Sequence, residues 1–266
     1  MSVGAPYFNS VFIPLMVPLL MLIGFGQTAH WRRDSFRRLF SIAKYPAACA
    51  TTLAIGAWAM LEGTGAIQAA LGLLMAFWVI VTTLKNLYLQ LSNATKISPI
   101  RRALLGQSVA HIGFAVTVIG VTLVSIYSVE KHVRMSPGES IEFSNYQATF
   151  DSIKKITGPN YSGVEATFNV TQDEKVIAVL FPQKRNYNAG SQTMTEAGIS
   201  AGITKDIYIA LGEKIDTEDW GVRLNIKPFV RWIWFGAFLM AAGGMIAASD
   251  LRFKRLNKNR RPSAQT

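Results

Sequence analysis

Five long apolar segments constrain the fold of this chain more than any other feature. They cover residues 11–29, 45–61, 67–84, 103–127 and 229–249. Each is long enough to cross a hydrocarbon core of about 30 Å as a helix. Pro14 and Pro18 should kink the first segment, which membrane helices tolerate. The sequence therefore predicts a polytopic α-helical membrane protein with five spans.

Composition agrees with this class. Half of the residues are hydrophobic and the mean hydropathy is +0.25, yet 27 Lys and Arg give a net charge of +11. No basic run is interleaved with aromatic side chains, as a nucleic-acid groove requires, so we expect no nucleic-acid partner. The single cysteine, Cys49, lies in an apolar stretch and excludes a disulfide framework.

The positions of Lys and Arg predict the orientation. They gather in the connections at 30–44 and 85–102 and in the tail at 252–266, which fall on one side of a five-span chain. Basic connections mark the cytoplasmic side of a membrane. We therefore expect a periplasmic N-terminus and a cytoplasmic C-terminus. The expected domains are four transmembrane helices (1–127), a periplasmic domain (128–228), a fifth helix (229–251) and a basic cytoplasmic tail (252–266).

The periplasmic domain, between spans four and five, reads as β-rich. Apolar and polar residues alternate at 164–170, 176–180, 207–211 and 220–226, which is typical of strands with one buried face. Turn residues at 158–160 and 188–190 punctuate these runs. The pattern predicts a small sandwich or barrel-like module, with 192–201 as the one region where a short helix could form.

His111 is the one ionisable side chain predicted to lie deep within a span. It falls about 12 Å of helix rise into the fourth segment, where such groups are costly and usually have a partner. A neutral imidazole is a suitable axial ligand for haem iron. Ser108 and Ala115 share its helix face and are small enough to admit a flat porphyrin. Alternatively, His111 hydrogen-bonds to a neighbouring helix and binds no metal.

The remaining features point to packing or to the surface. Gly106, Gly113 and Gly120 lie on the helix face opposite His111, which favours close helix packing. His30 and His132 are interpreted as surface residues. No hydrolase, nucleotide-binding or clustered metal motif occurs, so we assign no catalytic residue.

Seven stretches resemble one known family, in that family's order. They are 2–9 (SVGAPYFN), 106–114 (GQSVAHIGF), 158–161 (GPNY), 181–187 (FPQKRNY), 194–199 (MTEAGI), 206–213 (DIYIALGE) and 227–236 (KPFVRWIWFG). The chain resembles the C-terminal part of the CcmF/NrfE-type cytochrome c haem lyases, the large membrane subunits of cytochrome c maturation.

The resemblance implies a location in the cell inner membrane and a cofactor, haem b, with His111 as one axial ligand to its iron. In that family haem b is thought to pass electrons to haem from a haem chaperone before its attachment to apocytochrome c. The family's tryptophan-rich segment, its two periplasmic histidines and its upstream transmembrane histidine have no counterpart here. We therefore expect a split subunit or a fragment that is inactive without the N-terminal half.

The expected partners are that N-terminal half, the haem chaperone and apocytochrome c machinery, and the lipid bilayer. The chain's neutral start has no signal-peptide pattern, which fits a chain that continues an upstream membrane half. The alternative function is a non-catalytic membrane assembly platform in which His111 is structural. The sequence leaves open the second haem ligand and the surface by which the periplasmic domain would bind its partners.

Overall fold

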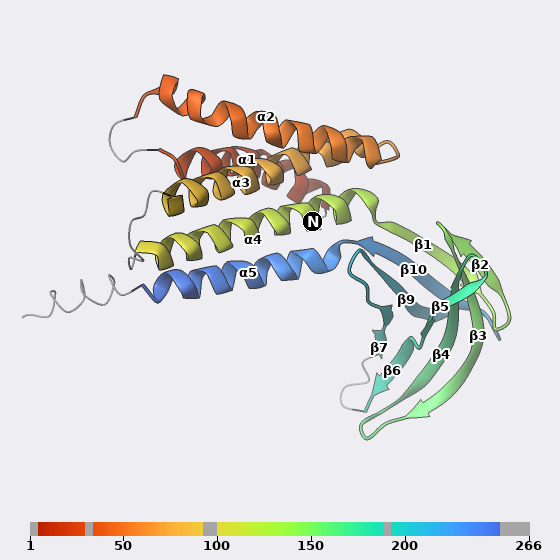
Figure 1. The fold of residues 1–266 in the computed structure, drawn as a ribbon. Helices are drawn as coiled ribbons and strands as arrows, with labels where there is room; N and C mark the ends of the chain where they lie inside the picture. Colours follow the sequence, from red (N-terminus) through yellow and green to blue (C-terminus); the bar gives the residue numbers. More distant parts are fainter. Residues whose placement is uncertain (1–4, 30–33, 93–99, 189–192, 251–266) are drawn as a thin grey trace, which may run out of the picture. The chain divides into compact units, whose positions relative to one another are not determined.

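The computed structural model describes residues 5–29, 34–92, 100–188 and 193–250. The chain divides into two compact units (Figure 1). A helical unit comprises Met1–Thr122 and Trp232–Thr266, and a β-rich unit comprises Leu123–Arg231. His30 and the basic tail at 252–266 lie outside the described residues.

Five helices correspond to the five apolar segments. They are α1 (Ala5–Gly26), α2 (Phe36–Met60), α3 (Ala66–Ser92), α4 (Ile100–Tyr127) and α5 (Val230–Ala248). Within the described residues, α1, α3, α4 and α5 are long and apolar enough to cross a membrane. The helix α2 has sufficient length, but Arg37, Arg38 and Lys44 lie in its first turns. The fifth span therefore remains a prediction.

Close packing between α4 and α5 depends on glycine. A Cβ atom at Gly113 would lie 2.7 Å from the carbonyl oxygen of Gly236, and one at Gly106 would lie 2.5 Å from that of Gly243. Such contacts are too short for any side chain, so the two backbones meet directly, as in other membrane helix pairs. The prediction that Gly106 and Gly113 form a close-packing face is confirmed.

The β-rich unit consists of two antiparallel sheets. One has the order β1 (Val129–Met135), β10 (Trp220–Pro228), β9 (Lys205–Lys214) and β8 (Gly198–Ser200). The other has the order β2 (Ser140–Phe143), β3 (Tyr146–Thr157), β4 (Tyr161–Gln172), β6 (Gln183–Tyr187) and β7 (Thr193–Glu196), and β5 (Lys175–Leu180) also pairs with β4. All four predicted strands are present.

Apolar side chains from both sheets form one core. Phe150 and Phe168, on β3 and β4, are fully buried, and their rings stack with centroids 4.6 Å apart. Ile209 and Leu224, on β9 and β10, are also fully buried in this core. The alternation of buried and exposed residues follows from the two-residue period of a strand.

The helix considered for 192–201 does not form. The described part of this region contains β7 and β8, separated by one residue. Thr193 and Thr195 are β-branched and favour strands. Gly198 packs so tightly that an added Cβ would lie 3.0 Å from the Leu180 side chain and the Phe181 backbone nitrogen. Strand pairing with β6 and β9 therefore decides this segment.

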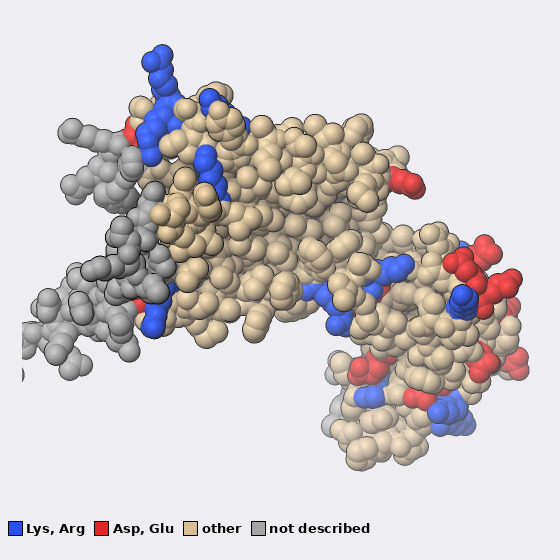
Figure 2. All heavy atoms as spheres, viewed as in Figure 1, with Lys and Arg blue, Asp and Glu red and all other residues tan. Residues whose placement is uncertain are grey.

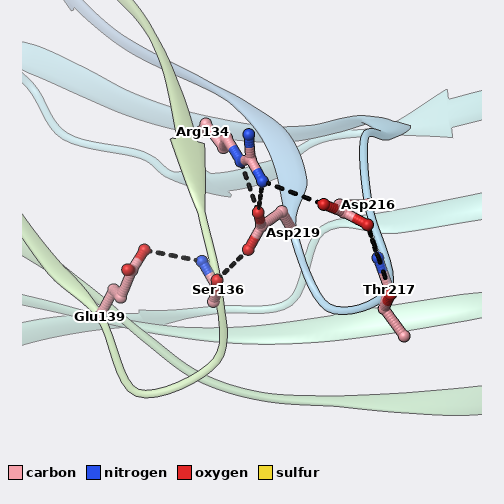
Figure 3. Close-up of polar contacts among 6 residues, drawn as sticks. All are labelled: Arg134, Ser136, Glu139, Asp216, Thr217 and Asp219. Carbon is pink, nitrogen blue, oxygen red and sulfur yellow. Dashed lines mark hydrogen bonds and ion pairs between the residues drawn. The ribbon is translucent and has the colours of Figure 1, made fainter.

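A polar cluster ties the β9–β10 loop to the turn after β1 (Figure 3). The Ser136 hydroxyl donates to one carboxylate oxygen of Asp219, and the Arg134 guanidinium donates to the other. Arg134 also lies 3.4 Å from Asp216, and the Ser136 backbone donates to Glu139 at 2.8 Å. Hydrogen bonds from Ser136 and Arg134 lower the pKa of Asp219 below its usual value.

We expect Asp219→Asn to make the stability of the β-rich unit less sensitive to acid. The folded pKa of Asp219 is depressed, so its carboxylate stabilises the fold above the unfolded pKa of about 3.9. That contribution disappears as the pH falls through the folded pKa. Thermal unfolding of the full chain in detergent at pH 7 and pH 3 tests this. An unchanged difference between the two midpoints in the variant would contradict the role of Asp219.

Candidate functional site

His111 lies near the middle of α4, about 17 Å of helix rise from Ile100. Its side chain is half-buried, and its Nδ1 atom is buried without a hydrogen-bond partner. Buried polar atoms nearly always have a partner, and an orphaned one calls for an explanation. The structure therefore leaves one ring nitrogen of this histidine in need of a ligand or a hydrogen bond.

A buried stripe of α4 packs against α3. A Cβ atom at Gly72 of α3 would lie 2.4 Å from the Thr122 hydroxyl of α4, so the two helices touch there. The buried residues of α4 on this side are Leu104, Ser108, Ala115 and Ile119. The buried residues of α3 with matching spacing are Ala76, Val79, Thr83 and Asn86. Spacings of three and four residues place each set on one helix face.

Ser108 and Ala115, the small neighbours of His111, belong to this stripe. They are 3% and 0% exposed, respectively, so they are enclosed by protein. Gln107, one turn before His111, is exposed, and Phe114 is partly exposed. His111 thus lies at the border between the buried stripe and an open flank. A flat ligand would reach its ring along the Gln107 side.

The helix α3 contributes polar groups that the sequence reading did not identify. The Oγ1 atom of Thr83 is buried without a hydrogen-bond partner. Its neighbour Thr82 donates to the Trp78 carbonyl oxygen at 2.7 Å. Asn86 accepts a hydrogen bond from Gln90 at 2.9 Å. These polar residues stand out within the apolar sequence of α3, but the sequence does not show that α3 is the helix that packs against α4.

The described Lys and Arg side chains of the helical unit that are visible in Figure 2 lie toward the end where α2 begins. Lys85 there donates to the Ile42 carbonyl oxygen at 2.8 Å. Asp250, after α5, accepts from the Ala103 backbone at 3.2 Å and thereby fixes the first turn of α4. The neutral interior favours an uncharged imidazole at His111.

His111 provides the chain's candidate metal ligand without help from a local cluster. Among the described residues, no group of three His, Cys, Asp or Glu side chains could hold a metal ion. His132, on β1, lies at the surface with its Nε2 atom 2.9 Å from Glu130, which confirms its interpretation as a surface residue. A six-coordinate iron would need a second axial ligand besides His111.

Residues 126–228 match the family described as CcmF C-terminal beta-sandwich. The chain is 40% identical over 96% of its length to the cytochrome c-type biogenesis protein CcmF of Escherichia coli (strain K12), covering 39% of that protein. It is 30% identical over 96% of its length to the NrfE protein of Haemophilus influenzae (strain ATCC 51907 / DSM 11121 / KW20 / Rd), covering 39%. The chain thus spans about two fifths of these relatives.

A solved structure has the same fold. The cytochrome c heme lyase CcmF superposes with a TM-score of 0.75 at 21% sequence identity, covering 92% of this chain and 41% of that one. At 92% coverage, the match extends over parts of both the helical unit and the β-rich unit.

Proposed function

We propose a function for this chain from two comparisons. Residues 126–228 belong to the CcmF C-terminal β-sandwich family, and the whole chain resembles the C-terminal part of the CcmF/NrfE-type haem lyases. The chain is part of a cytochrome c haem lyase complex in the inner membrane. It supplies one axial ligand to a membrane haem b and a periplasmic docking domain for haem attachment. The single observation that carries the haem role is the position of His111, a half-buried imidazole near the middle of the apolar helix α4.

The residues around His111 fit this role. The imidazole is held in an apolar helix with no charged neighbour on its own turn, so it stays neutral and can bind iron. Its open flank at Gln107 leaves room for a planar group. Ser108 and Ala115 are enclosed by protein on the other side of His111. When bound, haem b would supply one-electron redox chemistry.

We further propose that the β-rich unit docks the haem chaperone and apocytochrome c machinery on the periplasmic side. The match to a named β-sandwich family supports a role for this unit beyond anchoring. The N-terminal half of the lyase would contribute the second haem ligand. If haem is not bound at all, the alternative of an assembly platform with a structural His111 stands.

Assembly with the N-terminal half is the direct test. We expect the chain expressed alone to contain far less than one haem per molecule, because it offers one intramembrane ligand. Co-expression with the N-terminal half should give a b-type absorption spectrum and co-purification of both chains. Full haem occupancy in the isolated chain would contradict the shared site, unless crosslinking shows a homodimer with two copies of His111.

The proposed orientation has a separate test. Reporter fusions after Lys44, Lys96 and Lys254 should behave as cytoplasmic, and a fusion at Lys175 in the β-rich unit as periplasmic. The described basic residues at the start of α2 and the end of α3 motivate this expectation. A cytoplasmic signal at Lys175 would reverse α4 and overturn the whole arrangement.

A further inference from the structure

The contact between α3 and α4 fixes which of their residues lie at the same depth. The two helices are consecutive in the chain, and they run antiparallel because α3 ends where α4 begins (Figure 1). Gly72 lies against Thr122, so each step forward along α3 corresponds to a step backward along α4. Thr83 lies eleven residues after Gly72, and His111 lies eleven residues before Thr122. Both are therefore about 17 Å of helix rise from the contact, at the same level.

The neighbouring levels support this register. Val79 falls opposite Ala115, and Asn86 falls opposite Ser108. All four residues are buried; the first pair is apolar and the second pair is polar. The level of Thr83 and His111 is the one where both partners keep a buried atom without a hydrogen bond. Two unmet hydrogen-bonding groups at one depth of an apolar bundle are costly unless a third group, such as a buried water, bridges them.

We propose that Thr83 is the positioning residue for His111. Its hydroxyl oxygen accepts a hydrogen bond from one buried water that in turn accepts from Nδ1–H of the imidazole, since the two side chains form no direct hydrogen bond in this structure. Holding the proton on Nδ1 leaves the Nε2 lone pair unprotonated and directed by a fixed ring.

The neighbouring polar side chains of α3 already have hydrogen-bond partners. Thr82 donates to Trp78 at 2.7 Å and approaches the Val79 carbonyl oxygen at 3.1 Å. Asn86 is bonded to Gln90. Thr83 is therefore the described side chain of α3 with an unused hydroxyl at the level of His111. The consequence for iron binding rests on the proposed function, whereas the hydrogen bond itself does not require haem.

The tautomer of His111 tests the proposal in the haem-free chain. Three histidines give three pairs of ring nitrogen signals, and His111→Gln identifies the pair of interest. Solid-state nuclear magnetic resonance of the histidine-¹⁵N-labelled full chain in lipid bilayers, at a pH above 8, reports the neutral form. We expect the Nδ1–H tautomer to predominate. Thr83→Val should lower its ratio to the Nε2–H tautomer about fivefold, as the loss of one hydrogen bond implies.

Two further variants serve as controls. Thr83→Ser restores the hydroxyl and should restore the ratio. Thr82→Val removes an equally buried hydroxyl that is already bonded, and should leave the His111 signals unchanged. An unchanged tautomer in Thr83→Val, or a predominant Nε2–H form in the original chain, would overturn the proposal. If Thr83→Val shifts the tautomer ratio as expected but the assembled complex never binds haem, the proposed function is refuted and the role of Thr83 is not.

Discussion

Replacing His111 by alanine is expected to lower the haem b affinity of the assembled complex by about 100-fold or more. Changes at groups that merely orient a metal ligand cost 10–100-fold in affinity, and loss of the ligand itself should reach or exceed the upper end. Alanine is favourable in a helix and small, so α4 should still form. Haem titration of the complex with the N-terminal half, followed by absorption spectroscopy, measures the effect.

Two variants separate ligation from structure. His111→Gln keeps hydrogen-bonding capacity but is a poor iron ligand, so it should lose haem as alanine does. His132→Ala removes an exposed imidazole on β1 and should leave the spectrum unchanged. Normal haem binding by His111→Gln, with normal cytochrome c maturation, would show that His111 is structural and would favour the assembly-platform function.

Replacing Gly236 by leucine is expected to disrupt the pairing of α4 with α5 and prevent stable folding of the helical unit. A Cβ atom at this position would lie 2.4 Å from the Gly113 carbonyl oxygen and 2.6 Å from the Thr117 backbone nitrogen. Backbone atoms cannot turn aside as a side chain can, so the helices must separate. We expect a loss of about 3 kcal/mol or more, the upper range for overpacked sites.

Gly244→Leu is the matched control on the same helix. Nothing lies within 4 Å of a Cβ atom at Gly244, so this substitution adds apolar surface without a clash. Membrane levels of the two full-length variants and their resistance to limited proteolysis measure the difference. Equal stability of Gly236→Leu and Gly244→Leu would show that close contact between α4 and α5 does not support the fold.

Local patterns in the sequence were sufficient for the elements themselves. Apolar runs near twenty residues located all five helices, since a bilayer span requires that length. Two-residue alternation located β4, β5, β9 and β10 for the same kind of reason. Glycine spacing identified the α4 face that meets α5, because a contact with no room for a side chain requires glycine at each contacting position.

Contacts between distant residues were decided only by the tertiary structure. The segment 192–201 carries no strong period of its own, and pairing of β7 with β6 and of β8 with β9 makes it extended. The order of strands in the two sheets likewise depends on ladders such as β1 with β10, some ninety residues apart. Such pairings have no local signature, since each strand could satisfy its backbone with several neighbours.

The surroundings of His111 show the same division. Its identity and its depth in a span were evident from the sequence, because an ionisable group in an apolar run stands out. That Ser108 and Ala115 are enclosed, and that Thr83 lies level with the imidazole, required the contact between Gly72 and Thr122. A helix sequence gives the angular position of each side chain, but the neighbour that fills each direction is set by packing.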